Sequence, residues 1–135
     1  MSDRPKVAFI CTHNSCRSQM ADAIGKAMVS ETFEVFSAGT EIKGEINPDA
    51  VKAIQKLYGV DMTCTQRPKL LANLPPVDIV VTMGCGVQCP MLPCKHREDW
   101  GLEDPTGKSE GEFIRTAKII EEKIIGLKNR FSQPT

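Results

Sequence analysis

The sequence predicts an α/β fold in which a parallel sheet carries helices on both faces. Three short runs of strand-forming residues alternate with segments whose apolar residues recur every three or four positions. Such alternation is typical of a sheet built from strand–helix–strand units. A chain of 135 residues fits one domain with one core, so we expect residues 1–135 to form a single domain.

The three expected strands are short and apolar. The first covers residues 6–11 (KVAFIC) and the second covers residues 33–39 (FEVFSAG). Residues 77–83 (VDIVVTM) form an uninterrupted run rich in β-branched side chains, as in a central strand buried on both faces. Ligands of parallel sheets bind beyond the carboxyl ends of the strands. We therefore expect Cys11 and the residues that follow Met83 to meet at one edge of the sheet.

The expected helices lie between and after these strands. Residues 18–30 and 48–58 have apolar residues at helical spacing, and the second segment has Asn47 as its cap and Gly59 behind its last turn. A third helix is expected to run from Ser109 nearly to the end of the chain. Its apolar stripe consists of Phe113, Ala117, Ile120, Ile124, Leu127 and Phe131.

Charge and composition exclude several classes of protein. The chain has 17 basic and 17 acidic residues, so it lacks the bulk positive charge of a nucleic-acid or anionic-membrane binder. No stretch approaches the roughly 20 apolar residues of a transmembrane helix. The N-terminal sequence MSDRPKVAFI has too short an apolar run for a secretory signal. We expect a cytoplasmic protein that is a monomer.

The cysteines indicate chemistry rather than disulfide bonds, because a reducing compartment favours catalytic or metal-binding thiols. Five of the six cysteines fall in two clusters, Cys11 with Cys16, and Cys85 with Cys89 and Cys94. The second cluster lies in residues 85–108, which are rich in Gly and Pro and are expected to be irregular, with Trp100 as a core side chain. Cys64 stands apart, and we expect it to be a half-buried small apolar residue.

The segment FICTHNSCRSQM, residues 9–20, carries the main chemical signal. A strand stops at Cys11, and Arg17 follows six residues later where a helix begins. A tight loop between a strand and a helix directs backbone N–H groups inward as an anion nest, and the helix N-terminus adds positive potential. Arg17 adds a fork of donors that matches a tetrahedral oxyanion. These features together favour a thiolate at Cys11 and the binding of the anion that it attacks.

Individual residues of this loop have expected roles. Ser18 is placed to hydrogen-bond the Cys11 thiolate, and Asn14 tolerates the left-handed backbone that a tight loop requires. The side chain of His13 is expected to face solvent, and Cys16 is a second thiol that could form an off-pathway disulfide. The expected oxyanion cradle consists of Thr12, His13, Asn14, Ser15, Cys16 and Arg17.

Four motifs together resemble the low-molecular-weight tyrosine phosphatase superfamily. They are CTHNSCRSQM (11–20), SAGT (37–40), INPDAVKA (46–53) and EDPTG (103–107). The resemblance covers nearly the whole chain and implies the four-stranded parallel sheet of that family. Two further motifs, VTMGCGVQCP (81–90) and WGLEDPTGK (100–108), are similar to the thioredoxin-coupled arsenate reductases that share this fold.

The resemblance implies that three thiols reduce arsenate to arsenite. Cys11 attacks arsenate held by the loop and by Arg17, while Asp104 helps water to depart. Cys85 then attacks the sulfur of Cys11 and arsenite leaves. Cys89 attacks Cys85, and thioredoxin reduces the Cys85–Cys89 disulfide. The glycines on both sides of Cys85 suit the movement that this relay requires.

A phosphatase remains an alternative on the same loop. It would use only Cys11, Arg17 and Asp104, and it would leave the second cysteine cluster without a role. The phosphatases of this superfamily place tyrosines after the Asp-Pro pair to wall an aryl phosphate. This chain has Thr106 and Gly107 there, which argues against a wide aromatic pocket.

A zinc-binding module is the alternative from another class. Four soft ligands lie within a dozen residues, namely Cys85, Cys89, Cys94 and His96. Zinc would lock the thiols that the relay requires, and no second paired knuckle follows. Within the relay, Cys94 could compete with Cys89 for the resolving role.

The resemblance also implies a potassium site in some members, which maps here to Asn14, Asp22, Ser37 and Asp61. Turn and cap hydrogen bonds are the simpler interpretation of Ser37 and Asp61. No other bound cofactor is expected. The expected partners are arsenate, with phosphate and sulfate as competing anions, and thioredoxin as external reductant, but neither nucleic acid nor a membrane.

Overall fold

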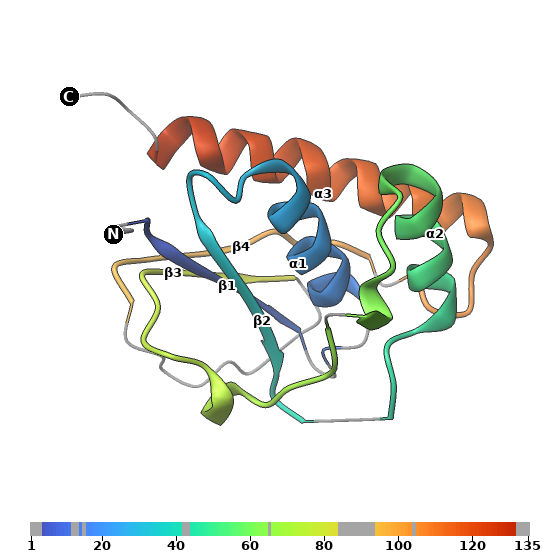
Figure 1. Cartoon of the computed structure of the whole chain (residues 1–135), viewed down its shortest axis with the longest axis horizontal. Coiled ribbons are helices and arrows are strands. Elements are labelled where there is room, and N and C mark those ends of the chain that lie inside the picture. The colour runs from blue at the N-terminus through green and yellow to red at the C-terminus, as the bar shows by residue number, and fades with distance from the viewer. Residues whose placement is uncertain are drawn as a thin grey trace.

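A computed structural model describes residues 4–11, 14, 16–41, 44–64, 66–83, 94–103 and 105–131. Its centre is one sheet of four parallel strands in the order β2-β1-β3-β4 (Figure 1). The strands are β1 (Lys6–Cys11), β2 (Glu34–Gly39), β3 (Ile79–Thr82) and β4 (His96–Asp99). The predicted four-stranded parallel α/β fold is confirmed.

Strand β4 lies in the segment that was predicted to be irregular, and that prediction was wrong. The sequence of β4 is HRED, and its side chains alternate between half-buried and exposed positions. Strand β4 lies at an edge of this sheet and pairs with β3 alone among the described strands. Charged side chains are common on such edges, and they leave no apolar alternation for a sequence pattern to detect.

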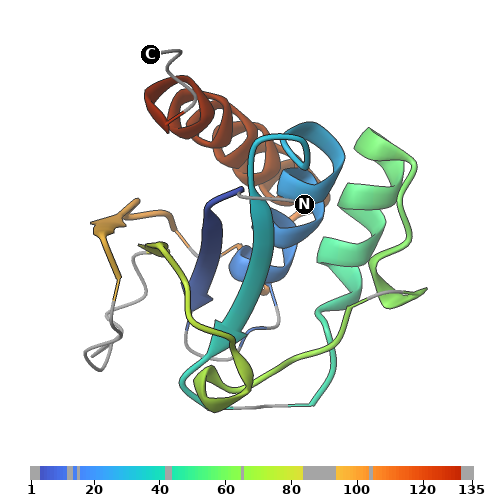
Figure 2. The ribbon, with the colours of Figure 1, turned by 60° about the vertical axis from the view of Figure 1, so that its left-hand side comes forward.

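Three α-helices accompany the sheet in the described part of the chain: α1 (Arg17–Met28), α2 (Pro48–Tyr58) and α3 (Glu110–Phe131). Figure 2 shows them together on one side of the sheet. Their buried side chains join those of β1 in one core cluster, which includes Val7, Phe9, Ile24, Ile54 and Ile120. This layer of apolar side chains accounts for most of the described core.

The opposite face of the sheet has a smaller cover. Ala8, Ile10 and Val80 point to this side, where the 3-10 helix η2 (Leu71–Asn73) and its neighbour Leu74 pack against them. Helices therefore cover both faces as predicted, but unequally among the described residues, with three α-helices on one face and a single short turn on the other.

The local signals for α2 predicted its ends correctly. Asn47 Oδ1 accepts a hydrogen bond from the backbone N–H of Asp49 at 2.8 Å, and Pro48 takes the first helical position. Gly59 ends the helix in the left-handed conformation, with φ at 69°. The helix therefore begins and ends where the sequence predicted.

Some burial predictions were wrong. Ala27 and Met28 of α1 are exposed although they lie at the apolar spacing of residues 18–30. Phe131 is 37% exposed at the end of α3, while the five other stripe residues are buried. Cys64, at the end of the 3-10 helix η1 (Met62–Cys64), is exposed rather than half-buried. Trp100 is buried as predicted.

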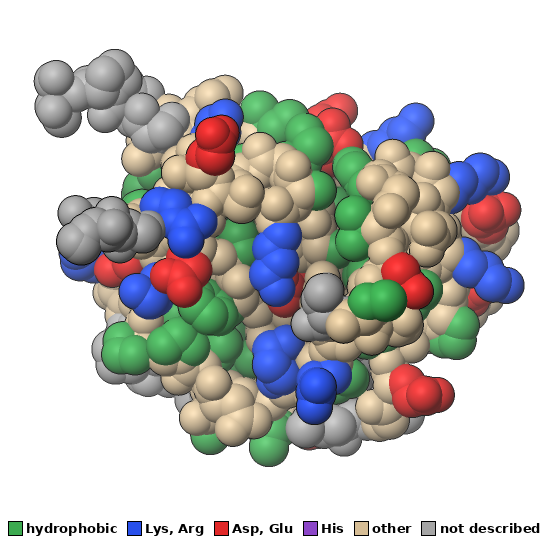
Figure 3. Space-filling view, in the orientation of Figure 1, with side chains coloured by type: hydrophobic (Ala, Val, Ile, Leu, Met, Phe, Trp, Pro, Cys, Tyr) green, Lys and Arg blue, Asp and Glu red, His purple; other side chains and the backbone are tan. Residues whose placement is uncertain are grey.

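No helix among the described residues combines the length and the apolar character that crossing a membrane would require. The face presented in Figure 1 instead carries scattered charge, and Figure 3 shows lysine and arginine side chains gathered in its middle. Lys69 interacts with the charges of Asp22, Lys26 and Arg67. Burial lowers the pKa of Lys69, and the two neighbouring cations act in the same direction.

Candidate active site

Cys11 is the last residue of β1, and its side chain is buried at 4% exposure. Its Sγ lies 2.8 Å from Oγ of Ser18, which belongs to the first turn of α1. The predicted contact between this thiol and Ser18 is therefore present. A hydroxyl at this distance is able to donate a hydrogen bond to a thiolate.

Asn14 shapes the loop between β1 and α1. Its φ of 53° is the one positive φ of a non-glycine residue among the described residues, as the sequence predicted. Its Nδ2 donates to Ser18 Oγ at 2.8 Å, and its Oδ1 accepts from the backbone N–H of Lys69 at 2.8 Å and from Gln19 Nε2 at 2.9 Å. Asn14 thus joins the loop to α1 and to the segment that follows η1.

Arg17 begins α1 and is 6% exposed. Its Nη1 donates to the carbonyl oxygens of Met83 at 3.0 Å and Leu102 at 2.7 Å, which commits both hydrogens of that nitrogen. Met83 in turn donates its N–H to Ile10 of β1 at 3.0 Å. The guanidinium is therefore held in a fixed orientation where the segments following β1, β3 and β4 come together.

The N-terminus of α1 suits an anion. The helix begins at Arg17, its N-cap residue Cys16 makes no side-chain capping bond, and the first turn contains no acidic residue. The positive end of the helix dipole therefore faces the loop without a competing carboxylate from its own first turn. Cys16 itself is buried at 5% exposure and belongs to the same core cluster as Cys11.

Two glutamines that the sequence analysis did not single out lie behind this loop. Gln19 is fully buried in α1 and donates to Asn14 and to the carbonyl of Arg67, while Gln66 is 8% exposed and donates to Gln19. A glutamine one position after Ser18, in the first turn of a buried helix, was a signal that could have identified Gln19. Gln66 gave no such signal, because it reaches the site from a distant part of the chain.

The potassium candidates Asp22 and Ser37 do meet. Ser37 Oγ donates to Asp22 Oδ2 at 2.6 Å, and both residues are almost fully buried. The ammonium nitrogen of Lys26 lies 2.8 Å from Asp22 Oδ1, and this contact is an ion pair without hydrogen-bond alignment. A protein cation therefore already faces the buried carboxylate.

The other two candidates are also engaged by protein donors. Asn14 Oδ1 already accepts two hydrogen bonds, which use both of its lone pairs. Asp61 is exposed and accepts from the N–H and hydroxyl of Thr63, whose hydrogen bonds hold the pKa of Asp61 below its usual value. Asp61 thus makes the turn contacts of the simpler interpretation. The four residues do not fit a resident potassium ion.

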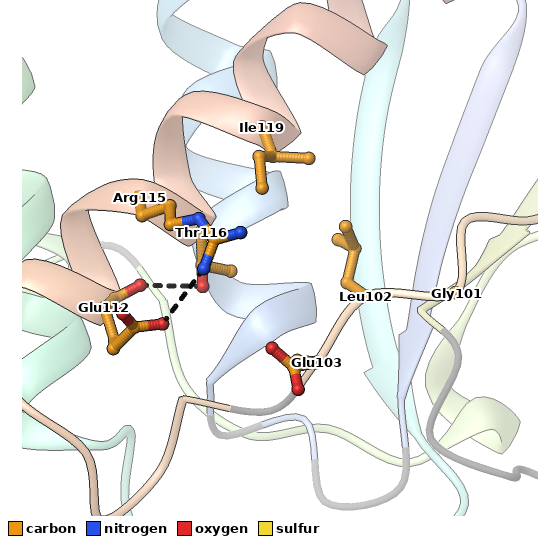
Figure 4. Close-up of a pocket in the computed structure, with 7 residues that line it drawn as sticks. All are labelled: Gly101, Leu102, Glu103, Glu112, Arg115, Thr116 and Ile119. Carbon is orange, nitrogen blue, oxygen red and sulfur yellow. Dashed lines mark hydrogen bonds and ion pairs between the residues drawn. The ribbon is translucent and has the colours of Figure 1, made fainter.

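A cavity of about 200 Å³ lies beside Leu102, between α3 and the segment that follows β4. Figure 4 shows Glu112 and Arg115 of α3 on one wall, where they form an ion pair at 3.5 Å, and Glu103 on the opposite wall. Two carboxylates face a single guanidinium there, so the charge of this cavity does not favour an oxyanion. The candidate oxyanion site is instead the loop on the Cys11 side of Arg17.

Six of the predicted site residues lie outside the described ranges: Thr12, His13, Ser15, Cys85, Cys89 and Asp104. Their roles therefore stay predictions. For the zinc alternative, no group of three His, Cys, Asp or Glu is placed to hold a metal among the residues that the structure describes. Cys94 is half-buried against the smaller core cluster.

His96 takes part in a separate cluster around Glu98 of β4. Glu98 lies 2.7 Å from His96 Nε2, and it accepts hydrogen bonds from Trp100 at 2.5 Å and from both terminal nitrogens of Arg130 at 3.0 and 2.9 Å. The bond with Arg130, ahead of those with His96 and Trp100, lowers the pKa of Glu98 to about 2. His96 therefore already has a partner in the fold.

Known proteins resemble this chain over almost its full length. Residues 6–134 match the family described as low molecular weight phosphotyrosine protein phosphatase. An arsenate reductase of Bacillus cereus (strain Q1) is 40% identical over 137 residues, which span 98% of this chain and 98% of that protein.

Solved structures give the same result. An arsenate reductase in the phosphate binding state superimposes with a TM-score of 0.85 at 32% identity, covering 94% of this chain and 98% of that one. A thioredoxin-dependent arsenate reductase of Corynebacterium glutamicum superimposes with a TM-score of 0.75 at 35% identity. That match covers 97% of this chain and 63% of the other.

Proposed function

We propose that this chain, which belongs to the low molecular weight phosphotyrosine protein phosphatase family, reduces arsenate to arsenite with Cys11 as its nucleophile. The observation that carries the proposal is the buried contact of 2.8 Å between Cys11 Sγ and Ser18 Oγ, at the end of the loop that leads to the fixed guanidinium of Arg17. The similarity of this chain to arsenate reductases supports arsenate as the substrate.

The first step forms a bond between Cys11 and arsenic. The thiolate attacks arsenate held by Arg17, the loop amides and the N-terminus of α1, and one arsenate oxygen leaves as water. Asp104 supplies a proton to that oxygen. Phosphate has the same shape and charge, and the phosphate binding state of one relative supports phosphate as a competing anion.

The second step moves two electrons to arsenic. Cys85 attacks the sulfur of Cys11, a Cys11–Cys85 disulfide forms, and the electron pair of the broken sulfur–arsenic bond leaves with arsenite. Cys89 then attacks Cys85, which frees the Cys11 thiolate and leaves a Cys85–Cys89 disulfide. Because this cycle consumes two thiols, it requires a reducing compartment such as the cytoplasm and an external reductant.

Thioredoxin is the reductant that we propose. The thioredoxin-dependent relative from Corynebacterium glutamicum supports this assignment. Cys94 is an unsuitable resolving thiol, because it packs against apolar side chains of the smaller cluster. This packing favours Cys89 for that role.

The direct test measures arsenite production from arsenate with thioredoxin, thioredoxin reductase and NADPH. An aryl phosphate measured in parallel tests the phosphatase alternative, which needs no second thiol. We expect arsenate-dependent oxidation of NADPH that ceases when thioredoxin is omitted. Hydrolysis of the aryl phosphate without any arsenite production would overturn the proposal.

The relay itself is tested by trapping disulfides. After one equivalent of arsenate and alkylation of the remaining thiols, mass spectrometry should find a Cys85–Cys89 bridge in the wild type. Cys89→Ser should stall with Cys11 joined to Cys85, and Cys85→Ser should release little arsenite. The matched control Cys94→Ser should keep multiple turnover. A Cys85–Cys94 bridge in the wild type would contradict the choice of Cys89.

A further inference from the structure

A continuous line of hydrogen bonds connects Cys11 to residues well outside its loop. It runs from Gln66 through Gln19, Asn14 and Ser18 to the Cys11 thiol, with distances of 2.6, 2.9, 2.8 and 2.8 Å between successive side chains. We call these residues the hydrogen-bond line. All five are buried, and none of the four polar side chains of the line is charged. A buried line of this kind has a direction, because each group must either donate or accept.

Backbone groups determine the direction of the hydrogen bonds at the outer end of the hydrogen-bond line. Gln66 Nε2 donates to the carbonyl oxygen of Gln19 at 3.1 Å, so the NH₂ group of Gln66 faces Gln19. Gln19 Nε2 donates one hydrogen to the carbonyl oxygen of Arg67 at 2.9 Å and shares the other between the backbone oxygen and Oδ1 of Asn14, at 3.0 and 2.9 Å. Because a carbonyl can only accept, Gln19 must turn its own Oε1 toward Gln66.

A backbone N–H determines the direction at the inner end. Lys69 donates its N–H to Asn14 Oδ1 at 2.8 Å, so the NH₂ group of Asn14 must face Ser18. Ser18 Oγ therefore accepts from Asn14. The single hydroxyl hydrogen of Ser18 is then available for Cys11 Sγ, which lies 2.8 Å away.

We infer that Gln66 and Gln19 are positioning residues that keep Ser18 a hydrogen-bond donor to Cys11. A donor at this place stabilises the thiolate over the thiol. Removing the amide of Gln66 leaves Gln19 Oε1 buried without its donor, so the Gln19 side chain loses one of its anchors and holds Asn14, and through it Ser18, less firmly. The inference rests on the proposed role of Cys11 as nucleophile, but it does not depend on arsenate as the substrate.

The test is the rate of Cys11 alkylation by iodoacetamide as a function of pH, because only the thiolate reacts. Cys11 and Cys16 share the tryptic peptide 7–17, and fragment ions distinguish them. Gln66→Met removes the amide at similar size, and we expect alkylation of Cys11 at pH 7 to slow about threefold to tenfold. The rate at high pH, where the thiol is fully ionised, should stay unchanged.

Two further variants keep the test decisive. Gln66→Glu retains the size of the side chain but loses its donor, so it should slow alkylation at pH 7 in the same way if Gln66→Met folds poorly. Gln55→Met is the matched control, because Gln55 is exposed on α2, and its alkylation curve should superimpose on that of the wild type.

A double-mutant cycle separates positioning from general loosening of the fold. Because the effect passes through the Ser18 hydroxyl, Gln66→Met should add no further slowing in a Ser18→Ala background. Folded Gln66 variants with the alkylation curve of the wild type would overturn the inference, and so would additive effects in the cycle. Failure of the arsenite assay would leave this readout intact, so the two proposals fail separately.

Discussion

Two clusters of polar side chains hold segments against the same sheet, and they do so by different means. The hydrogen-bond line behind Cys11 uses the uncharged side chains of Gln66, Gln19, Asn14 and Ser18, all of which are buried. The cluster on β4 uses charge, since Glu98 forms an ion pair with Arg130 near the surface and also contacts His96 Nε2.

The difference follows from burial and from what each cluster must do. Charged groups in the core are costly unless they are paired, whereas amides that satisfy one another and the backbone fix orientation at little electrostatic cost. Near the surface an ion pair links two elements, here β4 and α3, without needing a defined proton direction. The hydrogen-bond line should therefore govern the reactivity of the Cys11 thiol, and the Glu98 cluster should govern the stability of the fold.

The largest effect should come from Cys11→Ser. A hydroxyl at this position ionises far less readily than a thiol, so both arsenate reduction and any phosphatase activity should be abolished. Initial rates of arsenite formation and of aryl phosphate hydrolysis measure the two activities. Turnover of either substrate by the variant would show that another residue is the nucleophile.

Arg17→Lys should be the next most damaging change, with a loss of about 100-fold or more in kcat/KM. The charge is kept, but an ammonium lacks the planar fork that bonds Met83 and Leu102 while facing an oxyanion. Lys118→Arg on α3 is the control, because it makes the opposite exchange at an exposed position. It should have little effect on kcat/KM. Near-normal kinetics in Arg17→Lys would assign Arg17 a purely structural role.

Glu98→Gln should reduce stability more than reactivity. We expect the free energy of unfolding at pH 7 to fall by about 2 kcal/mol, a value kept small because Arg130 is half exposed. Urea unfolding followed by the fluorescence of Trp100, the one tryptophan and a partner of Glu98, measures this change. The exposed Glu122→Gln is the matched control.

The pH dependence sharpens the same comparison. The folded state lowers the pKa of Glu98 from 4.5 to about 2, so its contribution is complete above about pH 4.5. The contribution disappears as the pH falls toward 2, because protonation removes the ion pair with Arg130. Wild type and Glu98→Gln should therefore converge in stability near pH 2. A constant difference between them across this range would contradict the assignment.

The local parts of the site could be predicted from the sequence. A strand that ends at Cys11, a left-handed Asn14 and a helix that begins near Arg17 depend on neighbours within a few residues. Strand β4 could not be predicted, because an edge strand is defined by pairing with β3 rather than by apolar alternation.

The hydrogen-bond line behind Cys11 could not be predicted either. Gln66 and Gln19 are 47 positions apart, and an amide pair has no spacing rule that connects distant segments. The ion pair between Asp22 and Lys26 could have been predicted from the sequence, since residues four apart on a helix face each other. The resemblance directed attention to a potassium ion there, although the sequence already contained a lysine at the required spacing.

That lysine leads to the smallest expected effect. Because the Lys26 ammonium already faces the buried carboxylate of Asp22, replacing NaCl by KCl at equal ionic strength should leave the melting temperature and activity unchanged. Lys26→Met should remove this cation and lower stability, because the carboxylate of Asp22 then stays buried without a counter-charge. Adding Asp22→Asn to Lys26→Met should recover part of the loss, because no buried charge remains. A wild type that melts several degrees higher in KCl would show that the lysine does not replace the ion.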